Sequence, residues 1–204
     1  MVEAGALEIV SISGAAAAEC LADVARLRIE VFRAWPYLYQ GTIAHEQGYL
    51  AEFARANDAL VVVARDAGVV VGAATASPLA GHTPEFAALF AAHGIDPEAT
   101  FYCGESVLLA SYRGRGIGHA FFDRREAHAR ACRGRRGRFT QIAFCAVVRS
   151  PDDPRAPQGY TPLDAFWRKR GYTPVPGLVG TYSWKKTGAE SETENAMQFW
   201  MKAL

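Results

Sequence analysis

The sequence predicts a single domain of mixed α/β class. Short apolar runs with the two-residue period of a β-strand alternate along the chain with segments whose apolar residues recur at helical spacing. The length of 204 residues suits one domain with a sizeable core. The sequence has no internal repeat and no linker long enough to separate two domains, so we assign residues 1–204 to one domain.

The first half of the chain predicts a strand, two helices and a hairpin. Residues 7–12 alternate like a strand, and residues 15–32 follow with apolar side chains at helical spacing. A second helix is expected over residues 45–56. Two runs rich in valine and alanine, 60–66 and 68–76, are then expected to pair as a hairpin.

The second half alternates helices with strands. We expect Gly171 to end the last helix as a left-handed cap. The apolar run 197–201 is expected either to dock on the sheet or to cover a neighbouring subunit, which makes a homodimer a further expectation. The predicted strands are 101–109, 141–148 and 179–185, and the predicted helices are 85–93, 116–130 and 163–170.

Composition excludes several classes of function. Twenty-two Lys and Arg balance 21 Asp and Glu, and this near-neutrality argues against a nucleic-acid or membrane-surface binder. The four cysteines show no C-x-x-C spacing, so neither a metal site nor a redox pair is expected. The sequence shows no signal-peptide pattern and no apolar run near the ~20 residues of a membrane span, so we expect a cytoplasmic protein.

A glycine-rich loop, Arg113-Gly-Arg-Gly-Ile-Gly118, joins a predicted strand to a predicted helix. Glycine lets the backbone approach a ligand closely, and a helix start offers unpaired N–H groups and a positive dipole, so a phosphate group is the expected guest. Two common phosphate motifs are excluded. No Gly-Lys is followed by Ser or Thr, and His119 stands where a dinucleotide fingerprint needs its third glycine.

The R-x-x-G-x-G pattern at Arg113, Gly116 and Gly118 resembles the coenzyme A loop of the GCN5-related N-acetyltransferase (GNAT) superfamily. A second segment, residues 164–172, resembles the late helix of that family and its aromatic, glycine-containing end. Two motifs in the right order, roughly 50 residues apart, are far more specific than one glycine loop. The likeness covers residues 59–185, and residues 186–204 form a C-terminal extension.

The resemblance implies an acyl-CoA N-acyltransferase fold, with helices flanking a mixed sheet that is splayed between its fourth and fifth strands. It implies acetyl-CoA as the co-substrate and a primary amine of a small molecule or peptide as the acceptor. The pantetheine arm would lie in the splay like an added strand, and backbone N–H groups of the fourth strand would polarise the thioester carbonyl. The residues expected to bind the cofactor are Val107, Leu108, Leu109, Arg113, Gly114, Arg115, Gly116, Ile117, Gly118 and Trp167.

The expected catalytic residues are Glu105 and Tyr160. Family members often carry a Glu on the fourth strand as the general base, and Glu105 lies at that place, although a carboxylate in a salt bridge is an equal alternative. Trp167 occupies the position of the tyrosine that commonly protonates the leaving thiolate. Because an indole N–H is not an acid, Tyr160 in a neighbouring loop is the candidate in its place.

Three further expectations remain open on the sequence. Because Trp167 cannot act as the acid, an alternative function remains open, that of a non-catalytic acyl-CoA-binding module that acts through a partner. The aromatic stretch 32–39 and the loop 150–162 are the expected walls of the acceptor pocket, and the acceptor itself is not identified. We interpret the basic run 130–138 as a solvated helix end and turn. Contact of this run with an acidic partner or with the coenzyme ribose phosphate is the less favoured alternative.

Overall fold

The computed structural model describes residues 7–54, 56, 58–82 and 84–204. The first six residues of the predicted domain and Arg55 of the second predicted helix lie outside the described residues. Every helix and strand that the alternation of patterns predicts is present, most with bounds shifted by one or two residues. Two differ more, since the predicted helix 15–32 is a 3-10 helix over Gly14–Cys20 and an α-helix only from Leu21, and the strand predicted to start at residue 179 starts at Thr173. No helix in the described part of the chain combines the length and the hydropathy needed to cross a membrane.

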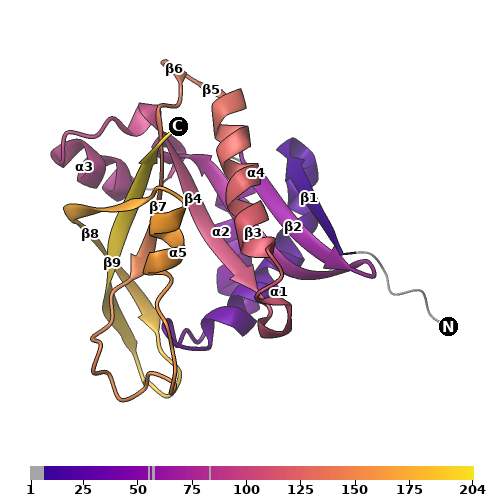
Figure 1. The fold of residues 1–204 in the computed structure, drawn as a ribbon, viewed down its shortest axis with the longest axis vertical. Coiled ribbons are helices and arrows are strands. Elements are labelled where there is room, and N and C mark those ends of the chain that lie inside the picture. Colours follow the sequence, from indigo (N-terminus) through magenta and orange to yellow (C-terminus); the bar gives the residue numbers. More distant parts are fainter. Residues whose placement is uncertain (1–6, 55, 57, 83) are drawn as a thin grey trace.

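A seven-stranded sheet forms the centre of the molecule, in the order β1-β2-β3-β4-β7-β9-β8 (Figure 1). Neighbouring strands are antiparallel except for β4 and β7, which are parallel. The strands are β1 (Glu8–Ser13), β2 (Leu60–Asp66), β3 (Val69–Pro78), β4 (Thr100–Leu108), β7 (Gln141–Val147), β8 (Thr173–Lys185) and β9 (Glu192–Ala203).

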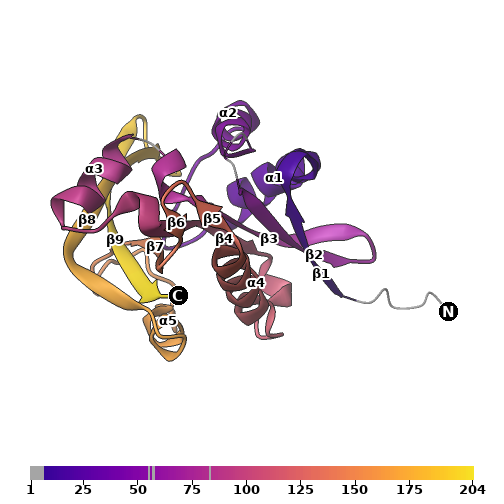
Figure 2. The same ribbon diagram turned by 90° about the horizontal axis from the view of Figure 1, so that it is seen from above.

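Helices cover both faces of this sheet (Figure 2). One face carries α1 (Leu21–Phe32), α2 (Ile43–Ala54) and α3 (Pro84–Ala92), and the other carries α4 (Ile117–Ala131) and α5 (Asp164–Lys169). Successive residues of a strand point to opposite faces. Val61 and Val63 of β2 therefore pack with α1 and α2, whereas Leu60 and Val62 pack under α4. Burial on both faces explains why β2 is an almost unbroken apolar run.

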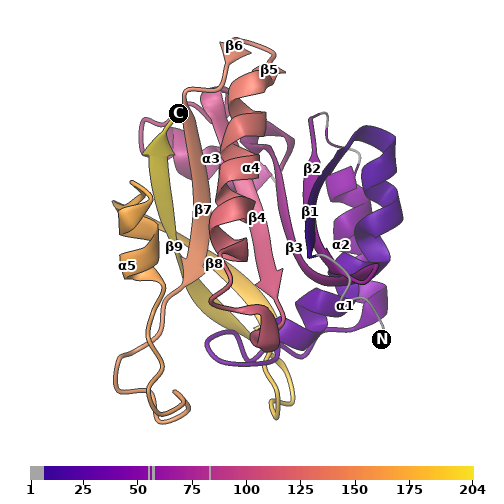
Figure 3. The same ribbon diagram turned by 45° about the vertical axis from the view of Figure 1, so that its right-hand side comes forward.

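The sheet opens between β4 and β7. The two strands pair only where Thr100–Tyr102 lie beside Gln141–Ala143. Beyond these pairs β4 stays with β3 as far as Leu108, and β7 stays with β9 as far as Val147. The ribbons separate toward their C-terminal ends, with α4 lying across them (Figure 3). The splayed mixed sheet that the resemblance implies is therefore confirmed.

The C-terminal apolar run 197–201 packs into the sheet, which is the first of the two predicted alternatives, rather than covering a neighbouring subunit. It lies in β9, which pairs with both β7 and β8. Phe199 and Trp200 are buried within the chain, so the run exposes no apolar face to a second subunit. The homodimer stays a prediction, and the C-terminal apolar run no longer supports it.

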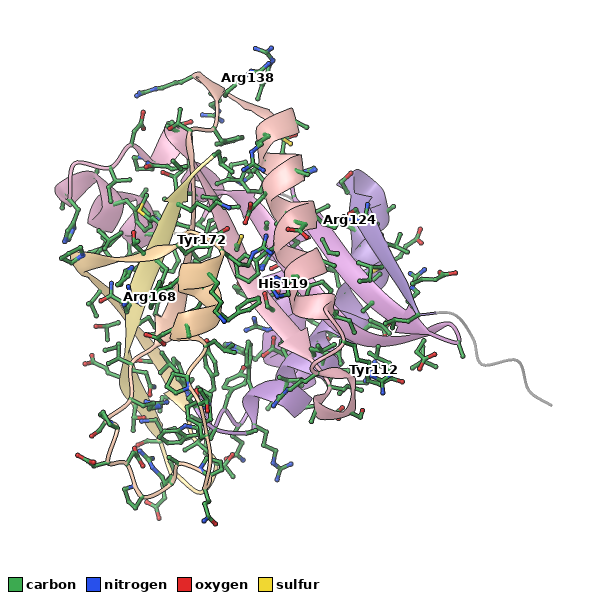
Figure 4. The ribbon with its side chains drawn as sticks, viewed as in Figure 1. Tyr112, His119, Arg124, Arg138, Arg168 and Tyr172 are labelled. Carbon is green, nitrogen blue, oxygen red and sulfur yellow. The ribbon has the colours of Figure 1, made fainter. Side chains whose placement is uncertain are left out.

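The basic run forms an exposed two-stranded ribbon, β5 (Arg133–Gly134) and β6 (Gly137–Arg138), directly after α4. Figure 4 places Arg138 at one end of α4 and Tyr112, in the glycine-loop region, near the other. The length of α4 thus separates the ribbon from the loop, which disfavours contact between this run and a coenzyme held there.

Candidate active site

The glycine loop leads from β4 into α4. A short 3-10 helix, Ala110–Tyr112, follows β4, and the exposed residues 113–116 then reach the first helical residue, Ile117. Gly116 caps α4 with φ of 80°, a left-handed conformation that favours glycine. The first bond of the helix runs from the Ala120 N–H to the Gly116 carbonyl. Within the described chain the preceding N–H groups, of residues 117–119, have no main-chain acceptor, and with the helix dipole they suit an anion.

Side chains brace the loop and leave one cation free. The Tyr112 hydroxyl donates to Asp66 Oδ2 at 2.7 Å, which ties the loop to the end of β2. Arg115 lies 4.8 Å from the Tyr112 ring and donates to the Ser111 carbonyl at 3.0 Å. The Arg113 side chain is exposed and makes no hydrogen bond or ion pair with the described residues, whereas its main-chain N–H donates to the Ala110 carbonyl at 3.2 Å. It is therefore available to a bound anion.

The open edge of β4 continues this surface. The Leu109 N–H donates to the Val71 carbonyl at 3.0 Å, toward β3. Because both main-chain groups of a residue point to one edge and alternate along a strand, those of Leu108 face the gap toward β7. The Val107 side chain is buried against α1 and α2, which anchors the strand. An extended ligand arm can thus pair with main-chain atoms here.

A β-bulge sets the direction of Glu105. Ala74 and Ala76 of β3 pair with Ser106 and Cys103, so two steps on β3 match three on β4. Such an extra residue reverses the alternation of side chains, and Glu105 consequently faces α1 and α2. From the other face, Arg125 of α4 donates to the carbonyls of Thr75 and Glu105 at 3.4 Å each. Arg125 thereby satisfies carbonyl groups beside the bulge.

Glu105 belongs to an acid–arginine cluster, which we define as Arg28, Glu46 and Glu105. Arg28 Nη1 donates to Glu105 Oε2 at 2.6 Å, and Arg28 Nε donates to Glu46 Oε2. The Tyr39 hydroxyl donates to Glu46 Oε1 at 2.7 Å, and the Tyr49 hydroxyl lies 3.4 Å from Glu105 Oε2. Glu105 Oε1 is buried and has no hydrogen-bond partner among the described residues. Glu105 is thus in a salt bridge, while one of its oxygens has no protein partner, and its role as a base stays a prediction.

Tyrosines and a cysteine line the same face of the gap. The Tyr102 hydroxyl and Cys145 Sγ are 3.1 Å apart. Burial raises the pKa of Tyr102, and burial together with the charge of Glu105 raises the pKa of Tyr49. Burial also raises the pKa of the Cys145 thiol to about 11. At neutral pH these groups are therefore protonated, and they act as hydrogen-bond donors rather than as bases or nucleophiles.

The aromatic stretch 32–39 and the loop 150–162 are in contact, and their role as walls of the acceptor pocket stays a prediction. The rings of Trp35 and Tyr160 lie edge to face with centroids 6.0 Å apart. Arg149, just before the loop, donates to the Pro36 carbonyl at 2.7 Å. Tyr160 is 40% exposed, and burial followed by the charge of Asp164 raises its pKa.

The late helix places its two aromatic side chains differently. Trp167 packs on β7 and β9, with ring centroids 5.0 Å from Phe144 and 5.2 Å from Trp200. Phe166 is the α5 ring that reaches α4, since a Cβ on Gly118 would lie 3.7 Å from its Cζ. Contact between Trp167 and the cofactor stays a prediction, and Phe166 is the ring nearer to the loop.

The sequence analysis missed Arg28, Glu46 and Tyr49. A signal for the first two exists, because Arg28 lies one turn after the buried Val24 on an amphipathic helix and Glu46 lies one turn before the buried Leu50. A charged residue at a core-facing helical position needs a partner. Among the described residues, no three or more His, Cys, Asp or Glu side chains lie together as a metal ion would require.

Comparisons with known proteins agree with this geometry. The sequence profile of the acetyltransferase (GNAT) family matches residues 24–147. No curated protein matches the chain. Among solved structures, ribosomal-protein-alanine N-acetyltransferase from Brucella melitensis has a TM-score of 0.58 at 18% identity, covering 97% of this chain and 100% of that one.

Two further structures are similar over nearly their whole length. An N-acetyltransferase from Staphylococcus aureus has a TM-score of 0.57 at 16% identity, covering 96% of this chain and 98% of that one. An acyl-CoA N-acyltransferase from Pseudomonas aeruginosa has a TM-score of 0.56 at 17% identity, covering 97% and 100%. At these identities the likeness shows the fold, while the profile covers more than half of the chain. The chain belongs to the acetyltransferase (GNAT) family, whose members use an acyl-CoA donor.

Proposed function

We propose that this protein transfers an acetyl group from acetyl-CoA to a primary amine of a small molecule or a peptide. One observation carries the proposal. The open main-chain edge of β4 runs directly into the unpaired N–H groups at the start of α4. This continuous surface offers strand-like pairing to an extended arm and then an anion site to a pyrophosphate.

The cofactor side of the site is assigned to main-chain atoms and one free cation. Of residues 107–109, Leu108 would pair through its main-chain groups with the pantetheine arm, and the N–H groups of the exposed loop and of residues 117–119 would hold the pyrophosphate. Arg113 adds a charge of the right sign. When bound, acetyl-CoA supplies the activated thioester. The Glu105 face of the gap is then left for the acceptor.

On the acceptor side we assign Glu105 as the general base. Its Oε1 atom has no protein partner and is free to accept a proton from the amine. The Cys145 thiol stays protonated near neutral pH because its pKa is about 11, which favours direct attack of the amine over an acetyl-cysteine intermediate. Tyr160, whose pKa is raised, remains the candidate proton donor to the thiolate.

The alternative is a non-catalytic acyl-CoA-binding module that acts through a partner. The packing of Trp167 between Phe144 and Trp200 favours it, because no tyrosine hydroxyl stands at that position. The open oxygen of Glu105 favours the enzyme. Release of free coenzyme A in the presence of amines separates the two functions.

Thermal melts with and without millimolar acetyl-CoA test the cofactor assignment. A ligand that binds only the folded state raises its stability by about 2.7 kcal/mol at a hundredfold excess over Kd. We expect Gly116→Glu to lose this shift, because the new carboxylate repels the pyrophosphate. Gly94→Glu is the matched control, since Gly94 also has a positive φ, of 71°, and open space around it.

Two outcomes would contradict the assignment. A wild-type protein that acetyl-CoA does not stabilise lacks the proposed cofactor site. An equal loss in both glycine variants would mean that a misplaced glutamate, not the loop, abolishes binding. Where the shift appears, coenzyme A release is measured with polyamines, amino acids, aminoglycosides and peptides with free N-termini.

A further inference from the structure

The acid–arginine cluster contains one cation too few. Glu46 and Glu105 are both buried, with exposed fractions of 0% and 4%, and their ion pairs in the described chain are with Arg28 alone. The other nearby cation, Arg125, approaches the main-chain carbonyl of Glu105 rather than its carboxylate. The cluster therefore holds two buried carboxyl groups against one guanidinium, one acid more than it has cations.

The two carboxylates are satisfied unequally. Each oxygen of Glu46 has a donor, from Arg28 and from Tyr39. At Glu105 both donors, Arg28 and Tyr49, converge on Oε2, and Oε1 has none. The carboxylate oxygen without a donor is therefore Glu105 Oε1 alone among the four carboxylate oxygens of the cluster.

Arg28 is held firmly in this arrangement. Its guanidinium carbon lies 4.6 Å from the Tyr49 ring and 5.3 Å from the Phe32 ring, and its side chain is only 15% exposed. Two ring contacts and two carboxylates leave a planar guanidinium little freedom. A fixed Arg28 fixes the Glu105 carboxylate in turn.

A buried charge that is only partly compensated destabilises a fold, and such costs are found where function needs them. The donor that best satisfies the open oxygen is a cation with N–H groups. We propose that Arg28 and Glu46 are positioning residues, which hold Glu105 with Oε1 open and one negative charge uncompensated, so that the site takes an acceptor arriving as an ammonium ion. This inference rests on the proposed function. Glu46 contributes by sharing Arg28, which would otherwise neutralise Glu105.

Paired isosteric variants test the charge arrangement without an identified acceptor. Glu105→Gln removes the uncompensated charge, and we expect Tm to rise by about 2–4 °C. Glu46→Gln removes a carboxylate whose oxygens are both bonded, and Tm should fall by at least as much. An ordinary structural ion pair would lower Tm in both variants. Changes of the same sign would overturn the proposal.

A small cation tests the ammonium site directly. Ethylammonium chloride should raise the wild-type Tm by about 1 °C more than potassium chloride at equal ionic strength when its concentration is near Kd. Glu105→Gln should lose this difference, and Asp123→Gln, with its exposed carboxylate on the far face, should keep it. Equal melts in the two salts, or a difference that survives Glu105→Gln, would overturn the ammonium assignment.

The acetyl-CoA melts separate this inference from the proposed function. Glu105→Gln should keep the wild-type stabilisation by acetyl-CoA, because the loop and the edge of β4 are unchanged. If acetyl-CoA stabilises neither protein, the acetyltransferase proposal fails. The signs of the two Tm changes and the ethylammonium shift still decide whether the cluster is a cation site.

Discussion

The glycine loop and the acid–arginine cluster flank the same gap but bind charge in different ways. The loop is exposed, continuous in sequence, and works through main-chain N–H groups that any residue with the right backbone supplies. The cluster is buried and works through side chains of α1, α2 and β4 that are up to 77 residues apart. An anion site can therefore be formed by one local turn, whereas a buried negative site depends on the whole tertiary arrangement.

This difference separates binding from stability. Because the loop makes few contacts with the core, changes in it should affect the ligand and leave the fold unchanged. Because the side chains of the cluster are largely buried between the sheet and α1 and α2, changes in it should affect the fold first. The predictions below examine this division, starting with the largest expected effect.

Arg28→Met should lower the free energy of unfolding by about 3–5 kcal/mol at pH 7, because it leaves two buried carboxylates without a counter-ion. Urea unfolding measures the loss. Arg26→Met on the same helix is the control. Arg26 is 42% exposed and its ion pairs are with Asp23 and Glu30, so its loss should cost less than about 1 kcal/mol. Similar losses in both variants would show that the cluster does not differ from a surface ion pair.

Protonation of His82 should also make the stability of the fold sensitive to acid. Its ring packs against Tyr102, with centroids 4.7 Å apart, Nε2 lies 3.2 Å from Ser77 Oγ, and burial lowers its pKa to about 4. Unfolded histidine titrates near 6.5. Between these values the unfolded chain binds a proton that the folded chain does not, so stability falls as pH falls from about 6.5 to 4.

The contribution of His82 is at most about 3.4 kcal/mol, from a pKa difference of about 2.5 at about 1.36 kcal/mol for each pKa unit. Urea unfolding at pH 7 and pH 4.5 should show a smaller loss for His82→Gln than for wild type. His45→Gln, which changes an exposed ring, should behave like wild type. An unchanged pH dependence in His82→Gln would mean that other buried groups bind the proton.

The same division decides what the sequence reveals. The loop could be predicted because Arg113 and the glycines that follow are adjacent, and the hairpin of β2 and β3 because its period is local. The direction of Glu105 could not, since strict alternation places it with Cys103 on the α4 face and only the bulge reverses it. Arg28 and Glu46 become meaningful once α1 and α2 are placed side by side. β9 was missed at its start because Glu192 and Glu194 are exposed and polar.

Arg113→Gln should produce the smallest effect, confined to the ligand. The Arg113 side chain is exposed and has no partner in the described chain, so the free energy of unfolding should change by less than about 0.5 kcal/mol. An exposed charge on the pyrophosphate contributes up to about 1 kcal/mol, so acetyl-CoA binding should weaken by up to about fivefold, less at high salt. Arg138→Gln makes the same change of net charge in β6, beyond the far end of α4, which at 15 residues is about 22 Å long (Figure 4). Calorimetric titration that finds equal weakening in both variants would assign the effect to the field of the whole protein. Weakening in Arg113→Gln alone would assign it to a direct contact at the loop.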